Sequence, residues 1–132
     1  MNYLLDTHAF LWTVGRSNNL SSAANKAITN ANNEIYVSAV SLWEISIKTR
    51  IGKLDLDGLE PEELVRLAEK MEFQFIGLSP EESISYGNLK EESHKDPFDR
   101  MLIWQAIRRN MILISKDREF KKFEGLGLQL FW

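Results

Sequence analysis

Residues 3–14 read YLLDTHAFLWTV, in which a short apolar run passes directly into a segment with the apolar spacing of a helix. We expect a strand over Tyr3–Leu5 and a helix over Thr7–Val14, with Asp6 at their junction. A strand that leads at once into a helix is the opening of a βαβ unit, whose two strands lie parallel in one sheet. The stretch therefore predicts an α/β protein with an acidic residue at the carboxyl end of its first strand.

The same alternation continues to the end of the chain. Further strands are expected over 35–37, 73–76, 111–114 and 128–131. Helices are expected over 22–31, 40–50 and 61–70, after Ser79-Pro80, and from Pro97 to about Arg109. Strands that alternate with helices predict a central, mainly parallel sheet flanked by helices on both faces. A chain of 132 residues is predicted to form one domain, over residues 1–132.

Composition limits the classes of function that remain. Hydrophobic residues make up 44% and charged residues 27%, as in an ordinary globular protein. The absence of cysteine excludes disulfides, thiolate metal sites and thiol nucleophiles. A formal net charge of −3 argues against nucleic-acid binding through a broadly basic surface. There is no signal-peptide pattern and no apolar run near the roughly 20 residues of a membrane span, so we expect a cytoplasmic protein without contact to a membrane.

Four acidic residues are predicted to meet at one edge of the sheet. Asp6 and Asp117 each follow a predicted strand, and Glu44 and Asp99 lie in the first turns of predicted helices. In parallel sheets, ligands bind at this carboxyl-end edge. Clustered carboxylates repel one another unless a cation lies between them, and oxygen ligands favour Mg²⁺ or Mn²⁺. Such an ion can lower the pKa of a bound water and stabilise charge on a phosphate, so the pattern predicts hydrolysis of phosphodiester bonds.

Each carboxylate also has a structural interpretation. Asp6 is a suitable N-cap for the helix that follows it, and Asp96 is a suitable N-cap before a proline at the first helical position. Glu44 ends the run SLWE, which is a capping-box pattern. Asp99 would be favoured by the positive end of its helix, and Asp117 suits a surface turn. Only the shared placement of these residues favours a site over separate structural roles.

The strings around the four acids resemble the motifs of PIN-domain ribonucleases, specifically the VapC-like toxins of type II toxin–antitoxin systems. LLDTHAFLW is similar to the first motif, with its acid at Asp6, and VSAVSLWEISIK to the second, with its acid at Glu44. HKDPFDRMLIWQA is similar to the third, with Asp99 as the acid and Asp96 as a frequent companion. LISKDREF is similar to the fourth, with its acid at Asp117. The resemblance covers essentially the whole chain.

This resemblance implies a single PIN-like nuclease domain over residues 1–132, with Mg²⁺- or Mn²⁺-dependent endoribonuclease activity. It also implies an RNA substrate such as tRNA or rRNA, a homodimer, and inhibition by a small antitoxin protein. For the site, we expect Asp6 and Asp99 to bind metal directly and Asp117 to bind it directly or through water. Glu44 would bind a second metal or position the attacking water. The role of Asp96 stays open between helix cap and site residue.

Other side chains near the predicted site are interpreted first as structural. Thr7 and Ser115 are expected to be strand-end hydroxyls, or to orient carboxylates and waters. His8 is expected on a packed or solvent-facing helix position. His94 is expected to be exposed in a polar loop, with contact to substrate or partner as the alternative. Nearby cations are expected to be solvated, with phosphate contact as the alternative: Arg100, Lys116 and Arg118. Aromatic side chains are expected in core or interface packing, and the C-terminal pair is expected to be buried or paired: Trp12, Trp43, Trp104, Phe131 and Trp132.

Other classes of function are alternatives to a ribonuclease. A receiver-type signalling domain needs a phosphoacceptor Asp after a middle strand, but the predicted strands 35–37 and 73–76 end in Ser-Ala and Gly. A catalytically silent PIN-fold module that only binds a partner is disfavoured by four intact acids. A metal-dependent nuclease acting on DNA, or a phosphatase, would use the same chemistry and stays open.

Overall fold

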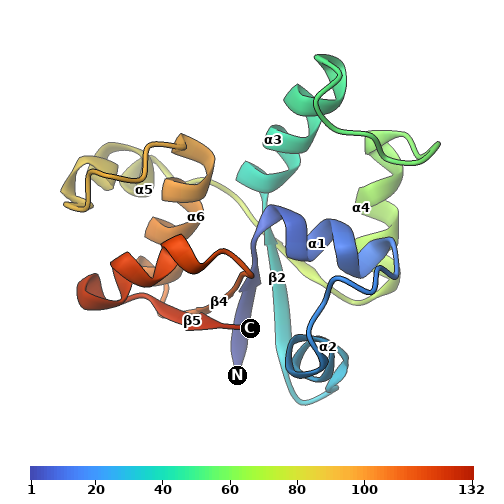
Figure 1. The fold of residues 1–132 in the computed structure, drawn as a ribbon, viewed down its shortest axis with the longest axis horizontal. Coiled ribbons are helices and arrows are strands. Elements are labelled where there is room, and N and C mark those ends of the chain that lie inside the picture. The colour runs from blue at the N-terminus through green and yellow to red at the C-terminus, as the bar shows by residue number, and fades with distance from the viewer.

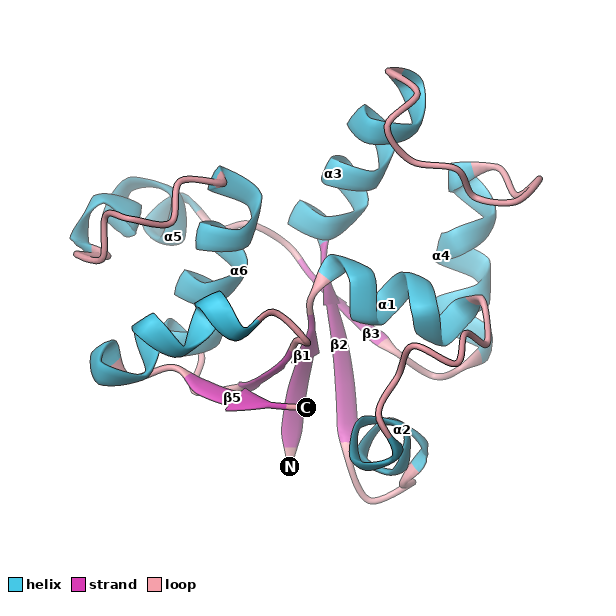
Figure 2. Cartoon of the chain, viewed as in Figure 1, coloured by secondary structure: helices cyan, strands magenta, loops and turns pink.

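The computed structural model describes residues 1–132 and contains one five-stranded sheet (Figures 1 and 2). Its strands are β1 (Asn2–Leu5), β2 (Glu34–Ser38), β3 (Gln74–Ile76), β4 (Ile112–Ile114) and β5 (Gln129–Phe131). They lie in the order β3-β2-β1-β4-β5, and every neighbouring pair is parallel. The predicted parallel sheet is confirmed.

The helices connect the strands in the predicted sequence. They are α1 (Thr7–Val14), α2 (Ser22–Thr29), α3 (Ala39–Arg50), α4 (Pro61–Lys70), α5 (Pro80–Ser85) and α6 (Pro97–Arg108). Two 3₁₀ segments, η1 (Tyr86–Asn88) and η2 (Arg118–Leu126), complete the chain. The predicted helix over 22–31 ends early, because Asn30 leaves the helical conformation and the Asn33 side chain bonds the Ala27 carbonyl at 2.9 Å. Segment η2 was not predicted, since a 3₁₀ helix lacks the 3.6-residue apolar period.

The start of α3 corrects one interpretation of Glu44. The hydroxyl of Ser38 caps this helix by accepting a hydrogen bond from the Val40 amide at 3.1 Å. Ser41 and Glu44 therefore lie inside the helix and do not form a capping box. The pattern SLWE was misleading because the true cap lies three residues earlier, at the last residue of β2.

Helices cover both faces of the sheet. Alternate residues of β1 point to opposite sides, so that Tyr3 and Leu5 belong to one buried cluster and Leu4 to the other. The first cluster includes residues of α1, α2, α3 and α4, and the second includes residues of α6 and η2. These two groups of helices lie on opposite sides of the sheet in Figure 2. No helix in the structure combines the length and the apolar character that a membrane crossing requires.

The strand order creates a crevice at the carboxyl ends of β1 and β4. From β1 the chain moves to β2 on one side of the sheet, whereas β4 pairs with β1 on the other side. The connections after β1 and β4 therefore leave the sheet in opposite directions, which is the arrangement at which open α/β sheets bind ligands. Asp6 stands at this point, and its amide donates to the Ile114 carbonyl at 3.0 Å.

A buried polar network ties α6 to the sheet. Gln105 is fully buried, accepts a hydrogen bond from Ser38 Oγ at 2.6 Å, and donates to Glu82 Oε1 and to the Gly77 carbonyl at 3.1 Å each. Burial raises the pKa of Glu82, but hydrogen bonds from Arg109, the Ser79 amide and Gln105 outweigh it and bring that pKa down to about 2. Every polar group of this network has a partner inside the protein.

We expect Gln105→Leu to lower the free energy of unfolding by about 2–3 kcal/mol, because a side chain of similar size removes one buried hydrogen-bond partner from each of Ser38, Glu82 and the Gly77 carbonyl. Urea denaturation with an unchanged m-value would measure this loss. Gln129→Leu is the matched control, since Gln129 is exposed and bonds only the exposed Asn110 side chain; its effect should stay within about 0.5 kcal/mol. Equal effects of the two substitutions would contradict a structural role for the network.

Candidate active site

A pocket of about 330 Å³ opens at the carboxyl ends of β1 and β4. The structure brings all four predicted acids and Asp96 to this one pocket, together with two lysines, a histidine and two aromatic side chains. Its lining residues are Asp6, His8, Trp12, Glu44, Lys48, Asp96, Asp99, Lys116, Asp117 and Phe120. Chain segments that are more than a hundred residues apart in sequence therefore supply carboxylates to the same small volume.

Asp6 is the most deeply placed aspartate of the pocket, with 8% of its surface exposed. It is also the N-cap of α1, since its Oδ1 accepts a hydrogen bond from the Ala9 amide at 2.8 Å. Burial raises the pKa of Asp6 to about 6, although hydrogen bonds from Ser115 and Ala9 lower it in part and the nearby Asp99 raises it further. A carboxyl group with such a pKa gains from a cation placed beside it.

Glu44 is held in one orientation by two donors. Thr7 Oγ1 donates to Glu44 Oε1 at 2.6 Å, and Lys48 Nζ donates to Oε2. Glu44 is 3% exposed, so this pairing places a buried carboxylate next to a cation from the following helical turn. Thr7 is thus an orienting group and not a simple strand-end hydroxyl. Lys48 was missed in the sequence, although its spacing of four residues from Glu44 is the signal for such a pair.

Asp99 lies in the first turn of α6 and is paired with a histidine. His94 Nε2 lies 3.0 Å from Asp99 Oδ2, so the expectation that His94 is simply exposed was wrong. Burial raises the pKa of Asp99; the hydrogen bond to His94 lowers it in part, and the charges of Asp96 and Glu44 raise it. Asp96 is the N-cap of α6 and accepts from the Phe98 amide at 2.9 Å, while it also lines the pocket.

Arg100 is buried, which corrects the expectation of a solvated charge. Its guanidinium donates to the carbonyls of Leu89 and His94, each at 2.9 Å, and to the carbonyl of Glu91. Its Nε also donates to the Tyr86 hydroxyl at 3.0 Å. The signal for this burial was present in the sequence, because Arg100 shares a face of α6 with the buried Ile103 and Trp104.

Asp117 differs from the other acids because its side chain is exposed. It begins η2 as its N-cap and accepts from the Glu119 amide at 2.9 Å. Its own amide donates to Ser115 Oγ at 3.1 Å, and Ser115 is also hydrogen-bonded to the Asp6 carboxyl group. Ser115 therefore links Asp6 to Asp117, which is the orienting role weighed for it in the sequence. Lys116 lies over the ring of Trp12, 5.7 Å from its centre.

The aromatic side chains have three different environments. Trp104 is buried as expected, and the C-terminal pair is partly buried, with Phe131 against Tyr3 and Trp132 against Trp12 at ring distances of 5.7 and 5.9 Å. Trp43 departs from core packing because 61% of its surface is exposed. Its ring meets only the edge of Phe98 among the aromatic residues, at 5.5 Å.

The donor set fits a hard divalent cation in its chemistry. The acidic groups of the pocket are carboxylates, the oxygen donors that Mg²⁺ and Mn²⁺ prefer, and two of them have raised pKa values. They do not form a ready ligand set, since no three His, Cys, Asp or Glu side chains of the chain converge closely enough to hold an ion. Their oxygens are instead held apart by partners such as Ala9, Lys48 and His94.

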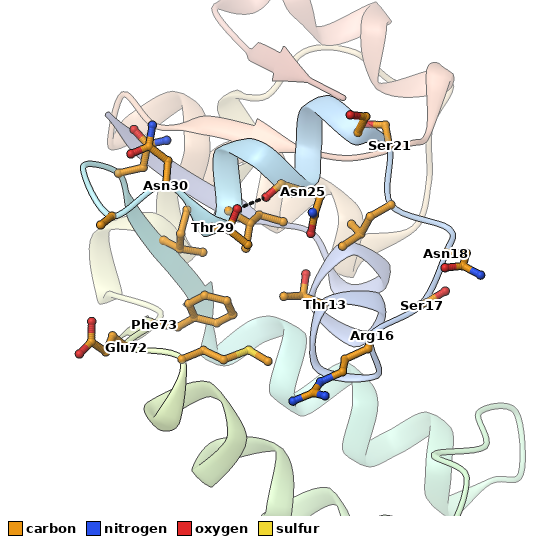
Figure 3. A pocket seen from close by; sticks show the side chains of 17 residues that line it. Thr13, Arg16, Ser17, Asn18, Ser21, Asn25, Thr29, Asn30, Glu72 and Phe73 are labelled. Atoms are coloured by element: carbon orange, nitrogen blue, oxygen red, sulfur yellow. Dashed lines mark hydrogen bonds between the residues drawn. The ribbon is translucent and has the colours of Figure 1, made fainter.

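A larger cavity of about 870 Å³ lies away from the acids (Figure 3). It is enclosed by the end of α1, by α2, by the start of β2 and by the turn before β3. Its floor is apolar, with Ile28, Ile35 and Phe73 buried there, and its rim is rich in serine, threonine and asparagine. Glu72 is the one carboxylate of its lining, so this cavity does not share the chemistry of the acidic pocket.

The sequence is similar to a known domain family and to one named ribonuclease. The sequence profile of the PIN domain matches residues 3–126. The chain is 30% identical to ribonuclease VapC22 of Mycobacterium tuberculosis over 118 residues, which cover 89% of this chain and 88% of that protein.

Solved structures share the fold at lower identity. A chain in the crystal structure of VapBC2 from Rickettsia felis, bound to a DNA fragment from its promoter, has a TM-score of 0.69 and 21% identity, over 99% of this chain and 98% of that one. A chain of DNA-bound VapBC from Salmonella typhimurium has a TM-score of 0.66 and 17% identity, over 99% and 97%. The profile match and the VapC relative show that this chain belongs to the PIN-domain family and is VapC-like.

Proposed function

We propose that the protein is a Mg²⁺- or Mn²⁺-dependent endoribonuclease and the toxin of a toxin–antitoxin pair. The observation that carries the proposal is the meeting of Asp6, Glu44, Asp96, Asp99 and Asp117 in one pocket at the edge of the sheet. The family supports it, since the relative that is 30% identical is named a ribonuclease. A net charge of −3 also favours a bound cation over a basic surface as the means of holding a phosphate.

Each acid has a role that suits its surroundings. Asp6 and Asp99 would hold the ion, because burial raises their pKa values and a cation relieves that cost. Asp117 would bind it directly or through water, as its exposure allows. Glu44, which Thr7 and Lys48 hold in one orientation, would bind a second metal or position the attacking water. The bound ion would supply charge stabilisation at the phosphate.

Two lysines of the pocket carry the positive charge that a phosphate of an RNA substrate would need. Lys48 and Lys116 both line it, and Lys116 is exposed, so a phosphate of the RNA backbone can reach its ammonium group. Asp96 stays a helix cap that adds negative charge to the pocket. A ribonuclease that acts on cellular RNA would work in the cytoplasm.

The proposed protein partners are a small antitoxin and a second copy of this chain. The neighbouring structures are VapBC assemblies, which supports a small antitoxin as the partner of this chain. A homodimer is supported by an apolar stripe along α3 and its C-cap, formed by Trp43, Ile47 and Ile51, whose spacing of four residues places them along one side of the helix. Trp43 and Ile51 are mostly exposed, so packing within the chain leaves much of this stripe uncovered, apart from the edge contact of Trp43 with Phe98.

With Mn²⁺ or Mg²⁺ present, we expect cleavage of RNA that EDTA abolishes, and a loss of about 100-fold or more in Asp6→Asn and Asp99→Asn, because several kcal/mol of transition-state stabilisation depend on the bound ion. Asp57→Asn is the control, since Asp57 is exposed and its positive φ of 52° suits asparagine. Equal residual cleavage by the wild type and Asp6→Asn would contradict the proposal. Equal cleavage of single-stranded DNA of the same sequence would contradict an RNA substrate.

The raised pKa of Asp6 predicts a pH-dependent cost in stability. Between about pH 4 and pH 6 the folded protein holds a proton at Asp6 that the unfolded chain releases, so stability falls as pH rises through this range and stays lower above it. Without metal, Asp6→Asn should be more stable than the wild type at pH 7 by about 2–3 kcal/mol and lose this advantage below pH 4. Asparagine also caps helices well, so the start of α1 is kept.

Urea denaturation in EDTA at pH 4 and pH 7 would measure this difference. Asp57→Asn serves again as the control and should shift stability by the same small amount at both pH values. An Asp6→Asn protein that is no more stable than the wild type at pH 7 would show that the buried carboxylate carries no such cost.

The apolar stripe on α3 predicts a dimer that a single charge disrupts. Trp43→Arg should turn a dimer into a monomer in sedimentation velocity, because it places an unpaired cation in an apolar contact. Leu126→Arg is the matched control, as Leu126 is also an exposed apolar residue but lies in η2. A dimer that survives Trp43→Arg would assign dimerisation to another surface.

A further inference from the structure

The loop before α6 is fixed by one side chain of that helix. Arg100 reaches back from the first turns of α6 and donates to three carbonyl groups of the loop, those of Leu89, Glu91 and His94. An arginine carries its donors in a rigid, planar arrangement and stays charged at all relevant pH values. The Arg100 side chain therefore fixes the path of residues 89–94 relative to α6.

His94 is the residue of this loop that faces the acids. Its backbone is held at both ends, because its amide donates to Glu91 Oε2 at 3.1 Å and its carbonyl accepts from Arg100 at 2.9 Å. Its ring packs edge-on against Phe120 and Phe123, with ring centres 5.5 and 6.1 Å apart. Backbone contacts and aromatic packing therefore hold the imidazole in place independently of its contact with Asp99.

The fixed ring then sets the orientation of Asp99. His94 Nε2 lies 3.0 Å from Asp99 Oδ2, and an ionised carboxylate can only accept hydrogen bonds, so Nε2 carries the proton of this contact. The contact engages one of the two carboxylate oxygens and leaves the other for a cation. Partners of this kind, one step removed from a metal, orient its ligands.

We propose that His94 is a positioning residue for Asp99: it presents this carboxylate to the cation, and Arg100 holds His94 in place for that task. The inference rests on the proposed function, because Asp99 needs a fixed orientation only if it binds an ion. His94 acts through Asp99 and does not touch the RNA. This role separates His94 from His8, which lines the acidic pocket itself and is exposed on α1.

The hydrogen bond itself can be tested without metal or substrate. The chain contains two histidines, so ¹⁵N spectra of the imidazole rings show only His8 and His94. We expect His94 to carry its proton on Nε2 and to exchange it slowly in the wild type. Asp99→Ala should remove this slow exchange at His94 and leave the signals of His8 unchanged. A His94 signal that is identical in the two proteins would overturn the proposed contact.

Binding of Mn²⁺ tests whether the hydrogen bond between His94 and Asp99 orients Asp99 for a cation. In titrations that follow free Mn²⁺ by electron paramagnetic resonance, His94→Phe should weaken binding by about 10-fold or more, since phenylalanine keeps the aromatic packing but has no donor. His94→Gln should stay within about threefold of the wild type, because its side-chain amide can donate to Asp99. Circular dichroism melting curves would confirm that both variants are folded.

The outcomes separate this inference from the proposed function. If the wild type binds no Mn²⁺, both are overturned. If the wild type binds Mn²⁺ and cleaves RNA while His94→Phe binds Mn²⁺ equally well, the inference alone is overturned. If both variants bind Mn²⁺ like the wild type but lose cleavage equally, His94 acts on the substrate, which also overturns a positioning role.

Discussion

Mutual repulsion among carboxylates is the constraint on which the rest of this structure depends. Five acidic side chains share a pocket of about 330 Å³, and burial already raises the pKa values of two of them. Nearby positive charge and hydrogen-bond donors offset part of this repulsion. Lys48 pairs with Glu44, His94 is hydrogen-bonded to Asp99, and the amino ends of α1 and α6 point their free amide groups toward Asp6 and Asp96. A divalent ion would complete this compensation.

Helix capping and a role in the site are therefore compatible. Asp6, Asp96 and Asp117 each cap a helical segment, and each also lines the pocket. In the sequence these roles competed as explanations for the same residue. In the structure, the cap is the means by which a carboxylate is held at the edge of the sheet, because the amide that it accepts from fixes its direction.

The sheet, its helices and the meeting of the acids could be predicted from the sequence, because apolar periodicity and the rule for parallel strands depend on local patterns. The individual side-chain contacts between different segments could not be predicted from the sequence. The contact of Thr7 with Glu44 depends on how α1 packs against α3, and the contact of His94 with Asp99 depends on how a loop folds back onto α6; no sequence period reports either. The cap of α3 was misplaced because two serines, Ser38 and Ser41, both suit that role.

The position of β1 in the sheet has a consequence for biosynthesis. Its residues precede those of the other four strands, yet β1 lies between β2 and β4, and more than a hundred residues separate β4 from β1 along the chain. A nascent chain can pair β1 with β2 and still lack the elements that bring Asp99 and Asp117 to Asp6. The acidic pocket can therefore form only after α6, β4 and the start of η2 have been made and have joined β1.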